Sequence, residues 1–159
     1  MTEAGGLSNA TTNDPTASGQ LTVHDVDSGQ NHFQAVAPAS LLGTYGSFTF
    51  NPNTGVWGYT LNQSLADPLI AGQVVHEHLI VTSFDGTATH DIDVTITGSN
   101  DNATITTSVS EDTTVLEDGG VANATAGDPS AAGTLTVHDV DSGENHFQTP
   151  ASLAGSYGT

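Results

Sequence analysis

Two segments of the chain repeat an oxygen-rich pattern that suits a bound cation. Residues 19–34 and 133–148 share fourteen of sixteen positions at an offset of 114, and each contains Asp-x-Asp-x-Gly-x-Asn. Alternate residues of an extended segment point the same way, so both Asp side chains can face one ion, and Gly permits the turn that returns the Asn. Ca²⁺ takes carboxylate and amide oxygens of this kind. The predicted ligands are Asp25, Asp27 and Asn31 in the first copy and Asp139, Asp141 and Asn145 in the second.

The charge balance strengthens the calcium hypothesis. The 159 residues include 18 Asp or Glu and no Lys or Arg, which gives a net charge of −18 with neutral His. Each carboxylate must therefore be solvated, hydrogen-bonded or bound to metal. The same charge argues against nucleic acid as a partner and against adhesion to an anionic membrane. No segment reaches transmembrane length, so we expect no membrane insertion.

Other interpretations of these motifs are weaker. Asp, Asn and Gly also mark ordinary turns, but two copies in a chain without basic residues favour calcium. An EF-hand loop needs Glu at its twelfth position, where this chain has Val36 and Pro150. Residues 76–78 read His-Glu-His and suggest zinc on a strand face, but no third ligand is placed, so polar outward-facing residues are favoured. No nucleophile or paired acid with a role is evident, and we expect no enzyme.

The repeat extends beyond the sixteen-residue block. Glu3 aligns with Glu117, and Tyr45 aligns with Tyr157 after a two-residue deletion in the second copy. The chain thus holds about one and a half repeats: residues 1–102 as a repeat lacking its first strand, and residues 103–159 as the N-terminal half of a second, incomplete repeat. We expect residues 47–102 to pair with the first copy, and a concentration-dependent dimer through the unpaired edges of the incomplete repeat.

The local pattern predicts an all-β fold. Residues 45–50 and 56–61 are aromatic-rich runs joined by Asn-Pro-Asn-Thr-Gly, which indicates a hairpin. Residues 73–83 and 87–97 alternate apolar and polar side chains, with Ile92, Val94 and Ile96 inward. Leu21 and Val23 are expected to line the inner side of another strand. The aromatic hairpin residues could stack on a sugar, but most are expected in the core. Short strands and regular turns indicate an antiparallel sandwich.

The chain resembles the cadherin-like, or VCBS-type, repeats of large secreted bacterial adhesins, among them rhizobial adhering proteins. The repeat's start is matched by residues 115–117 with residues 133–145, and its end by residues 79–85 with residues 94–102. Residues 43–50 and 55–61 match the bacterial version more closely. The resemblance implies a Greek-key β-sandwich with calcium between neighbouring repeats, type I secretion to the bacterial cell surface, and adhesion in biofilm through exopolysaccharide or another surface glycan. A passive calcium-stiffened spacer and a lectin proper are the alternatives.

The resemblance also implies a set of ligands by position. The junction would use Glu3, then Asn100, Asp101 and Asn102 from the linker, then Asp139, Asp141 and Asn145; Asp25, Asp27, Asn31 and Asp85 would form an equivalent half-site, with Glu117 as the counterpart of Glu3. One departure stands out, since the acidic pair of animal cadherins is not evident around residues 70–73. We therefore expect fewer ligands there. The start of the chain lacks a signal peptide, which fits export without an N-terminal signal or a piece of a longer protein.

Overall fold

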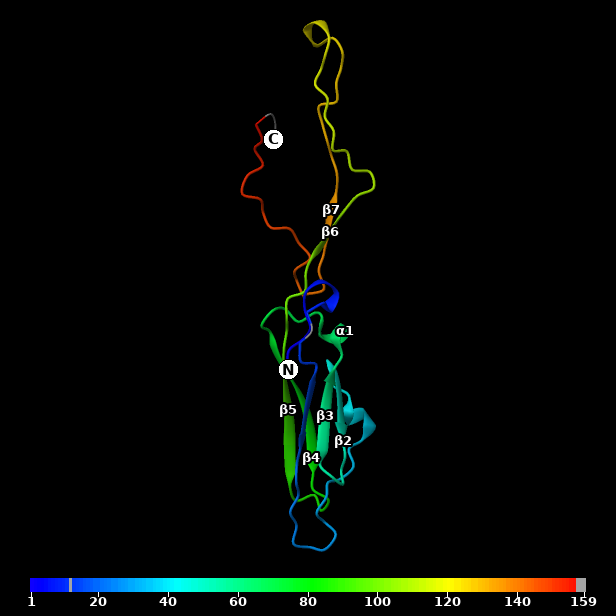
Figure 1. Ribbon diagram of the computed structural model, residues 1–159, viewed down its shortest axis with the longest axis vertical. Coiled ribbons are helices and arrows are strands. Elements are labelled where there is room, and N and C mark those ends of the chain that lie inside the picture. Colours follow the sequence, from blue (N-terminus) through cyan, green and yellow to red (C-terminus); the bar gives the residue numbers. More distant parts are fainter. Residues whose placement is uncertain (12, 157–159) are drawn as a thin grey trace. The chain divides into compact units, whose positions relative to one another are not determined.

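The computed structural model describes residues 1–11 and 13–156, and the chain divides into two compact units (Figure 1). The first unit comprises Met1–Asn102 with Val140–Ser142, and the second comprises Ala103–Asp139 with Gly143–Thr159. The first unit holds five strands and the described part of the second holds two, and every strand pair in the described sheets is antiparallel, which confirms the predicted all-β, antiparallel class. None of the described helices is long and apolar enough to cross a bilayer.

One sheet of the first unit has three strands in the order β1-β3-β2. The hairpin predicted from the aromatic runs is confirmed, since β2 pairs with β3 and Gly55 takes a positive φ of 67° in the connecting turn. Asn51 closes this turn, because its Oδ1 accepts hydrogen bonds from the backbone N–H groups of Asn53 and Thr54. The strands are β1 (Thr16–Gln20), β2 (Gly46–Phe50) and β3 (Val56–Leu61).

The other sheet of the first unit is the pair β4 (Val74–Thr82) and β5 (Thr89–Thr97), labelled in Figure 1. Its side chains alternate as the sequence predicts. Ile92, Val94 and Ile96 are buried, whereas Asp91 and Asp93 on the opposite face are exposed. Such alternation lets one face of a sheet cover a core while the other meets water.

The core lies between these two sheets. Phe48 and Tyr59 of the three-stranded sheet pack edge to face, with ring centroids 4.7 Å apart, against the inner residues of β4 and β5. The short helix α1 (Gln63–Ala66) adds Ala66, which is fully buried. Of the hairpin aromatics, Phe48 and Tyr59 are core residues, whereas Phe50 and Trp57 are half-buried against the core. The 3-10 turn η2 (Pro38–Leu41) contributes Leu41 at its margin.

The N-terminal segment runs beside the end of β5. Single bridges pair Thr2 with Thr97 and Gly6 with Asp101, both in parallel, before the chain enters the 3-10 turn η1 (Leu7–Asn9). Gly5 lies closest to the linker that follows β5: a Cβ there would come within 2.7 Å of the Asn100 carbonyl oxygen. The segment needs glycine at this position, and its close approach places Glu3 against the linker.

The predicted strand does not extend to Leu21 and Val23 in the first copy, although both side chains are half-buried against the core. The strand there is β1, which ends at Gln20, and the last bond that continues along β3 joins the Leu21 N–H to the Gly55 carbonyl at 3.0 Å. Among the described residues, Thr22 to His24 make no backbone hydrogen bond. The chain there has run past the end of β3, so no neighbouring strand is left for it to pair with.

The second unit contains the pair β6 (Thr104–Thr107) and β7 (Leu135–His138), and the 3-10 turn η3 (Val121–Asn123). Here the equivalent of residues 21–24 does form a strand. None of the described side chains of this unit belongs to the buried hydrophobic core, and Ile105, Leu116 and Phe147 are all exposed. The second unit therefore has backbone pairing without a core.

Candidate metal centre

Glu3 is the most deeply buried carboxylate in the described chain. Its backbone N–H donates to the Thr97 carbonyl at 3.0 Å, which fixes the residue beside β5. The Ser99 N–H donates to Glu3 Oε2 at 3.2 Å, whereas Oε1 is buried with no hydrogen-bond partner among the described residues. The residue is 0% exposed. A buried carboxylate oxygen without a donor is costly, so it calls for a proton, a water or a bound cation as its partner.

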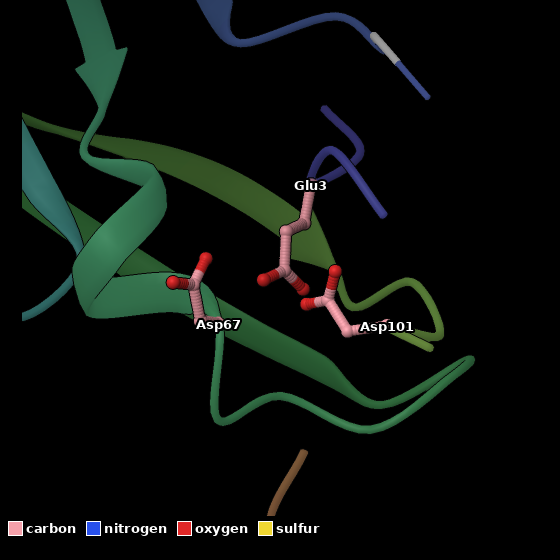
Figure 2. A group of neighbouring side chains, drawn as sticks. All are labelled: Glu3, Asp67 and Asp101. Atoms are coloured by element: carbon pink, nitrogen blue, oxygen red, sulfur yellow. The ribbon is translucent and has the colours of Figure 1, made fainter. Parts of the chain in front are cut away.

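Two further carboxylates face Glu3 (Figure 2). Glu3, Asp67 and Asp101 each offer an oxygen, and these atoms lie within 4.8 Å of one another. Asp67 follows the last residue of α1, and its Oδ1 accepts a hydrogen bond from Asn9 Nδ2 at 3.1 Å. Asp101 lies on the linker, where its bridge to Gly6 holds it next to the N-terminal segment. Three separate parts of the chain thus converge on one point.

Asp141 is a fourth carboxylate of the same unit and is 1% exposed. Its Oδ2 accepts a hydrogen bond from the Asp101 N–H at 2.9 Å. The neighbouring Ser142 N–H donates to the Pro68 carbonyl at 3.2 Å, which anchors this segment beside the end of α1. We call Glu3, Asp67, Asp101 and Asp141 the acidic cluster.

The acidic cluster is electrostatically unfavourable without a cation. Burial, the largest cause, and the negative charges of Asp101, Asp67 and Asp141 together raise the pKa of Glu3 from 4.5 to about 7, against the lowering effect of the Ser99 N–H. Two unit charges at this separation repel by about 3 kcal/mol at an effective dielectric constant of about 20. No Lys or Arg exists to offset them. A proton or a bound metal ion must therefore compensate the charge.

The donor set fits a hard cation. All four side chains offer carboxylate oxygens, the ligands that Ca²⁺ prefers, and Ca²⁺ tolerates irregular geometry with six to eight oxygens. Zinc prefers imidazole and thiolate ligands, and the acidic cluster contains neither. Glu3, Asp67 and Asp101 could thus hold a metal ion, and Asp141 accepts the Asp101 N–H beside them.

The two Asn residues predicted as linker ligands make hydrogen bonds that position the linker. The Asn100 carbonyl accepts a hydrogen bond from the Gly6 N–H at 2.8 Å, and the Asn102 N–H donates to the Gly6 carbonyl at 3.3 Å. The Asn100 side chain donates to the Asp101 carbonyl. Both side chains are exposed. Their backbones position Asp101 next to the N-terminal segment.

Three predicted ligands belong to the second unit. Asn145 Oδ1 accepts a hydrogen bond from the Asp139 N–H at 2.5 Å, which closes the repeated loop. Glu117, the counterpart of Glu3, is exposed. These residues lie outside the unit that holds the acidic cluster.

The equivalent loop of the first copy is closed in the same way. Asn31 Oδ1 accepts from the Asp25 N–H at 2.7 Å, Asp25 Oδ1 accepts from the Asp27 N–H at 2.8 Å, and Gly29 has a positive φ of 87°. Among the described residues, Asp25, Asp27 and Asp85 form no convergent group of three carboxylates. The Asn and Asp side chains here accept backbone hydrogen bonds that close the turn, as such residues commonly do.

Asp85 lies in the turn between β4 and β5. The Ser83 hydroxyl donates to its Oδ1 at 2.6 Å and the Thr87 hydroxyl donates to its Oδ2 at 2.7 Å. These hydroxyl bonds, together with the Thr87 N–H, lower the pKa of Asp85 from 3.8 to about 2. Both oxygens of this carboxylate thus accept hydrogen bonds that shape the turn.

Sequence reasoning missed Asp67. The expectation of few ligands around residues 70–73 overlooked the Asp-Pro pair that directly follows α1, three residues upstream. The second copy stops before this region, so no repetition drew attention to it. The available signal was a carboxylate at the end of a short helix, immediately before a proline that stops the chain from continuing as a helix.

The His-Glu-His segment divides between the two faces of β4. His76 Nδ1 lies 2.7 Å from Asp93 Oδ1, and His78 Nδ1 lies 3.0 Å from Asp91 Oδ2, both on the exposed face. Glu77 is buried, which corrects the expectation that all three residues face outward. Its Oε1 accepts a hydrogen bond from the Tyr45 N–H at 2.8 Å. The alternation of the strand demands this orientation for Glu77.

Compared with models of known protein families and with curated protein sequences, the chain gives no match. The resemblance to cadherin-like repeats therefore stays a prediction, and the functional argument depends on the acidic cluster.

Proposed function

We propose that the first unit binds Ca²⁺ through the acidic cluster and serves as a non-catalytic, cadherin-like module of an extracellular bacterial adhesin. The observation that carries the calcium proposal is Glu3, whose fully buried carboxylate has an oxygen without a hydrogen-bond partner and faces two other carboxylates. An ion at this point would supply the missing partner and offset the repulsion.

Such an ion would act as a structural tie. Its four ligands come from the N-terminal segment, the end of α1, the linker after β5, and Val140–Ser142. The ion would join these four segments and so contribute to their order. Metal ions that bind only the folded state stabilise it by mass action.

Binding to an acidic polysaccharide is opposed by the negative charge of the protein. A chain of net charge −18 repels an acidic polysaccharide. Calcium resolves this conflict by neutralising part of the surface or by bridging protein and sugar carboxylates. Export by type I secretion and placement at the cell surface in biofilm belong to the same proposal, as does contact with neighbouring repeats of similar sequence.

A spacer without a ligand of its own is the second candidate. It is favoured by the burial of Phe48 and Tyr59, because aromatic side chains in the core cannot stack on a sugar. In that case the only role of calcium is to stiffen the module. Binding of an acidic polysaccharide with calcium, lost in chelator, separates the adhesive module from the spacer; a chelator-resistant interaction contradicts the bridging mechanism.

Thermal unfolding with and without calcium tests the metal proposal. At about 100 times its dissociation constant, calcium should add about 2.7 kcal/mol to the free energy of unfolding. Mg²⁺ should substitute poorly, because it demands octahedral geometry at shorter distances. The matched variants are Asp141→Asn, which should lose this stabilisation, and Asp27→Asn at the equivalent repeat position, which should retain it. An identical response of both variants would contradict the assignment.

A further inference from the structure

Residues 21–24 of the first unit belong to no strand pair among the described residues. These residues read Leu-Thr-Val-His, and Leu135–His138 of the second unit has the same sequence. The second copy is strand β7 and pairs with β6, whereas Thr22 to His24 of the first copy make no backbone hydrogen bond among the described residues. Identical residues are thus paired in one place and unpaired in the other.

The unpaired segment borders an open cleft. A hollow of about 230 Å³ separates Leu21, Thr22, Val23 and His24 from Val81, Ala88, Thr89 and His90. Thr89 and His90 begin β5, whose other edge is occupied by β4. The lining of the cleft thus includes both the unpaired segment and the first residues of β5. Unpaired edges of this kind accept an additional strand from another chain.

We propose that residues 21–24 of one molecule bind Thr104–Thr107 of a second copy as an antiparallel strand. The occupant is identified by the pairing already present in the second unit, where the same four residue types face β6. Residues 21–24 take the place of β7 along β6, so the register follows from that pairing, in which Ile105 lies opposite Val137 and Thr106 opposite Thr136. In the docked pair, Ile105 faces Val23 and Thr106 faces Thr22.

The two segments are chemically compatible. Neither residues 21–24 nor Thr104–Thr107 contain a carboxylate, so the local contact avoids the repulsion that dominates the rest of the surface. Ile105 is 61% exposed beside β7, and docking would place it against the β-branched Val23 at the cleft. Cross-strand pairs of β-branched residues stabilise antiparallel sheets.

The docking strand, Thr104–Thr107, and the segment that receives it, residues 21–24, lie at different places in the chain, so this contact is heterologous. A heterologous contact that does not close into a ring builds linear arrays of molecules. The net charge opposes the association over distance, and salt at physiological strength screens charges beyond about 8 Å. The association should therefore strengthen with both protein concentration and salt. This inference is independent of the calcium proposal.

Disulfide trapping between full-length chains tests the strand register. The protein has no Cys, so a single substitution per chain permits only intermolecular bridges. Thr22→Cys mixed with Thr106→Cys should give several-fold more covalent dimer than Thr22→Cys mixed with Thr107→Cys, because neighbouring residues of a strand point to opposite faces. All three positions are exposed, so the fold should tolerate the changes.

Equal yields from the two mixtures would overturn the proposal, since random encounters do not distinguish the faces of a strand. Hydrogen exchange on the unmodified chain provides a second measurement. The amides of Thr22, Val23 and His24 should become protected as protein concentration rises, and more so when salt is added. Protection that does not change with concentration would equally overturn the proposal.

Discussion

The two copies of the repeated segment share their loops and differ in their surroundings. Gly5 pairs with Thr11 and Gly119 with Thr125, through reciprocal hydrogen bonds of 2.8–3.1 Å, and Asn9 and Asn123 both have a φ of 56°. The repeated acidic loops agree as well, with φ values of 87° at Gly29 and 85° at Gly143. Local sequence is sufficient for these turns, because Gly and Asn tolerate left-handed backbone.

The two copies differ in how deeply their equivalent side chains are buried. Phe33 is 7% exposed and packs edge to face on Phe50 at 5.2 Å, whereas its counterpart Phe147 is 48% exposed. Glu3 is buried against the linker and Asp67, whereas Glu117 is exposed. The partners that bury the first copy come from residues 47–102. The comparison shows that the chemistry of the acidic cluster comes from tertiary context and not from the repeated residues alone.

The largest expected contrast is in the core. Phe33→Ala should destabilise the first unit by about 3–5 kcal/mol, because it removes a buried ring and leaves a cavity. Phe147→Ala should change the free energy of unfolding by no more than about 0.5 kcal/mol, since the ring is half exposed. Urea unfolding followed by circular dichroism measures both. Similar losses would mean that the second copy also has a packed core.

The next contrast is in pH dependence without calcium. The pKa of Glu3 is raised in the folded state from 4.5 to about 7, so the folded state binds this proton more tightly than the unfolded state. Its contribution to stability is fully present below pH 4.5 and is lost as pH rises through about 7. At about 1.4 kcal/mol per unit, the loss is on the order of 3 kcal/mol.

Glu3→Gln isolates this contribution from the other carboxylates. The stability of Glu3→Gln should not fall over that pH window, whereas the stability of Glu117→Gln should fall as it does in the unmodified protein. Calcium should flatten the profile of the unmodified protein, because the ion compensates the charge in place of the proton. If the stability of Glu3→Gln in chelator still falls with rising pH as steeply as that of the unmodified protein, Glu3 is not the source of the pH dependence.

A smaller contrast is expected at two equivalent glycines. Gly5→Ala would place a Cβ 2.7 Å from the Asn100 carbonyl oxygen, whereas a Cβ at Gly119 meets nothing within 4 Å. The first change should cost about 1–3 kcal/mol, because the backbone around Glu3 must shift. The second should be within about 0.5 kcal/mol of neutral. Calorimetric melting temperatures check this pair, and equal shifts would show that the close approach at Gly5 carries no strain on substitution.

Much of the fold follows from the sequence. Alternation of apolar residues located β4 and β5, and the Asn-Pro-Asn-Thr-Gly turn located the β2–β3 hairpin. The misplaced strand at Leu21 and Val23 shows where this reasoning stops, because identical residues form strand β7 when a partner strand is present. Strand formation depends on a partner, and pairing between distant segments is not encoded in a short pattern.

The candidate site was predictable in part. Asp101 and Asp141 carry the oxygen-rich motifs that drew attention to them, and Glu3 followed from the resemblance. Asp67 was not predicted, because a single Asp at the end of a short helix belongs to no repeated motif. The burial of Glu77 follows from strand alternation but runs against the usual exposure of Glu. Both cases depend on tertiary contacts that no local motif encodes.

Calorimetric titration of calcium into the full chain and into Glu3→Gln and Glu117→Gln tests the central claim most directly. The account predicts calcium binding by the unmodified protein, a loss of affinity of about tenfold or more in Glu3→Gln, equivalent to at least about 1.4 kcal/mol, and no change in Glu117→Gln. Unchanged affinity in Glu3→Gln, or equal losses in both variants, would contradict a calcium ion in the acidic cluster.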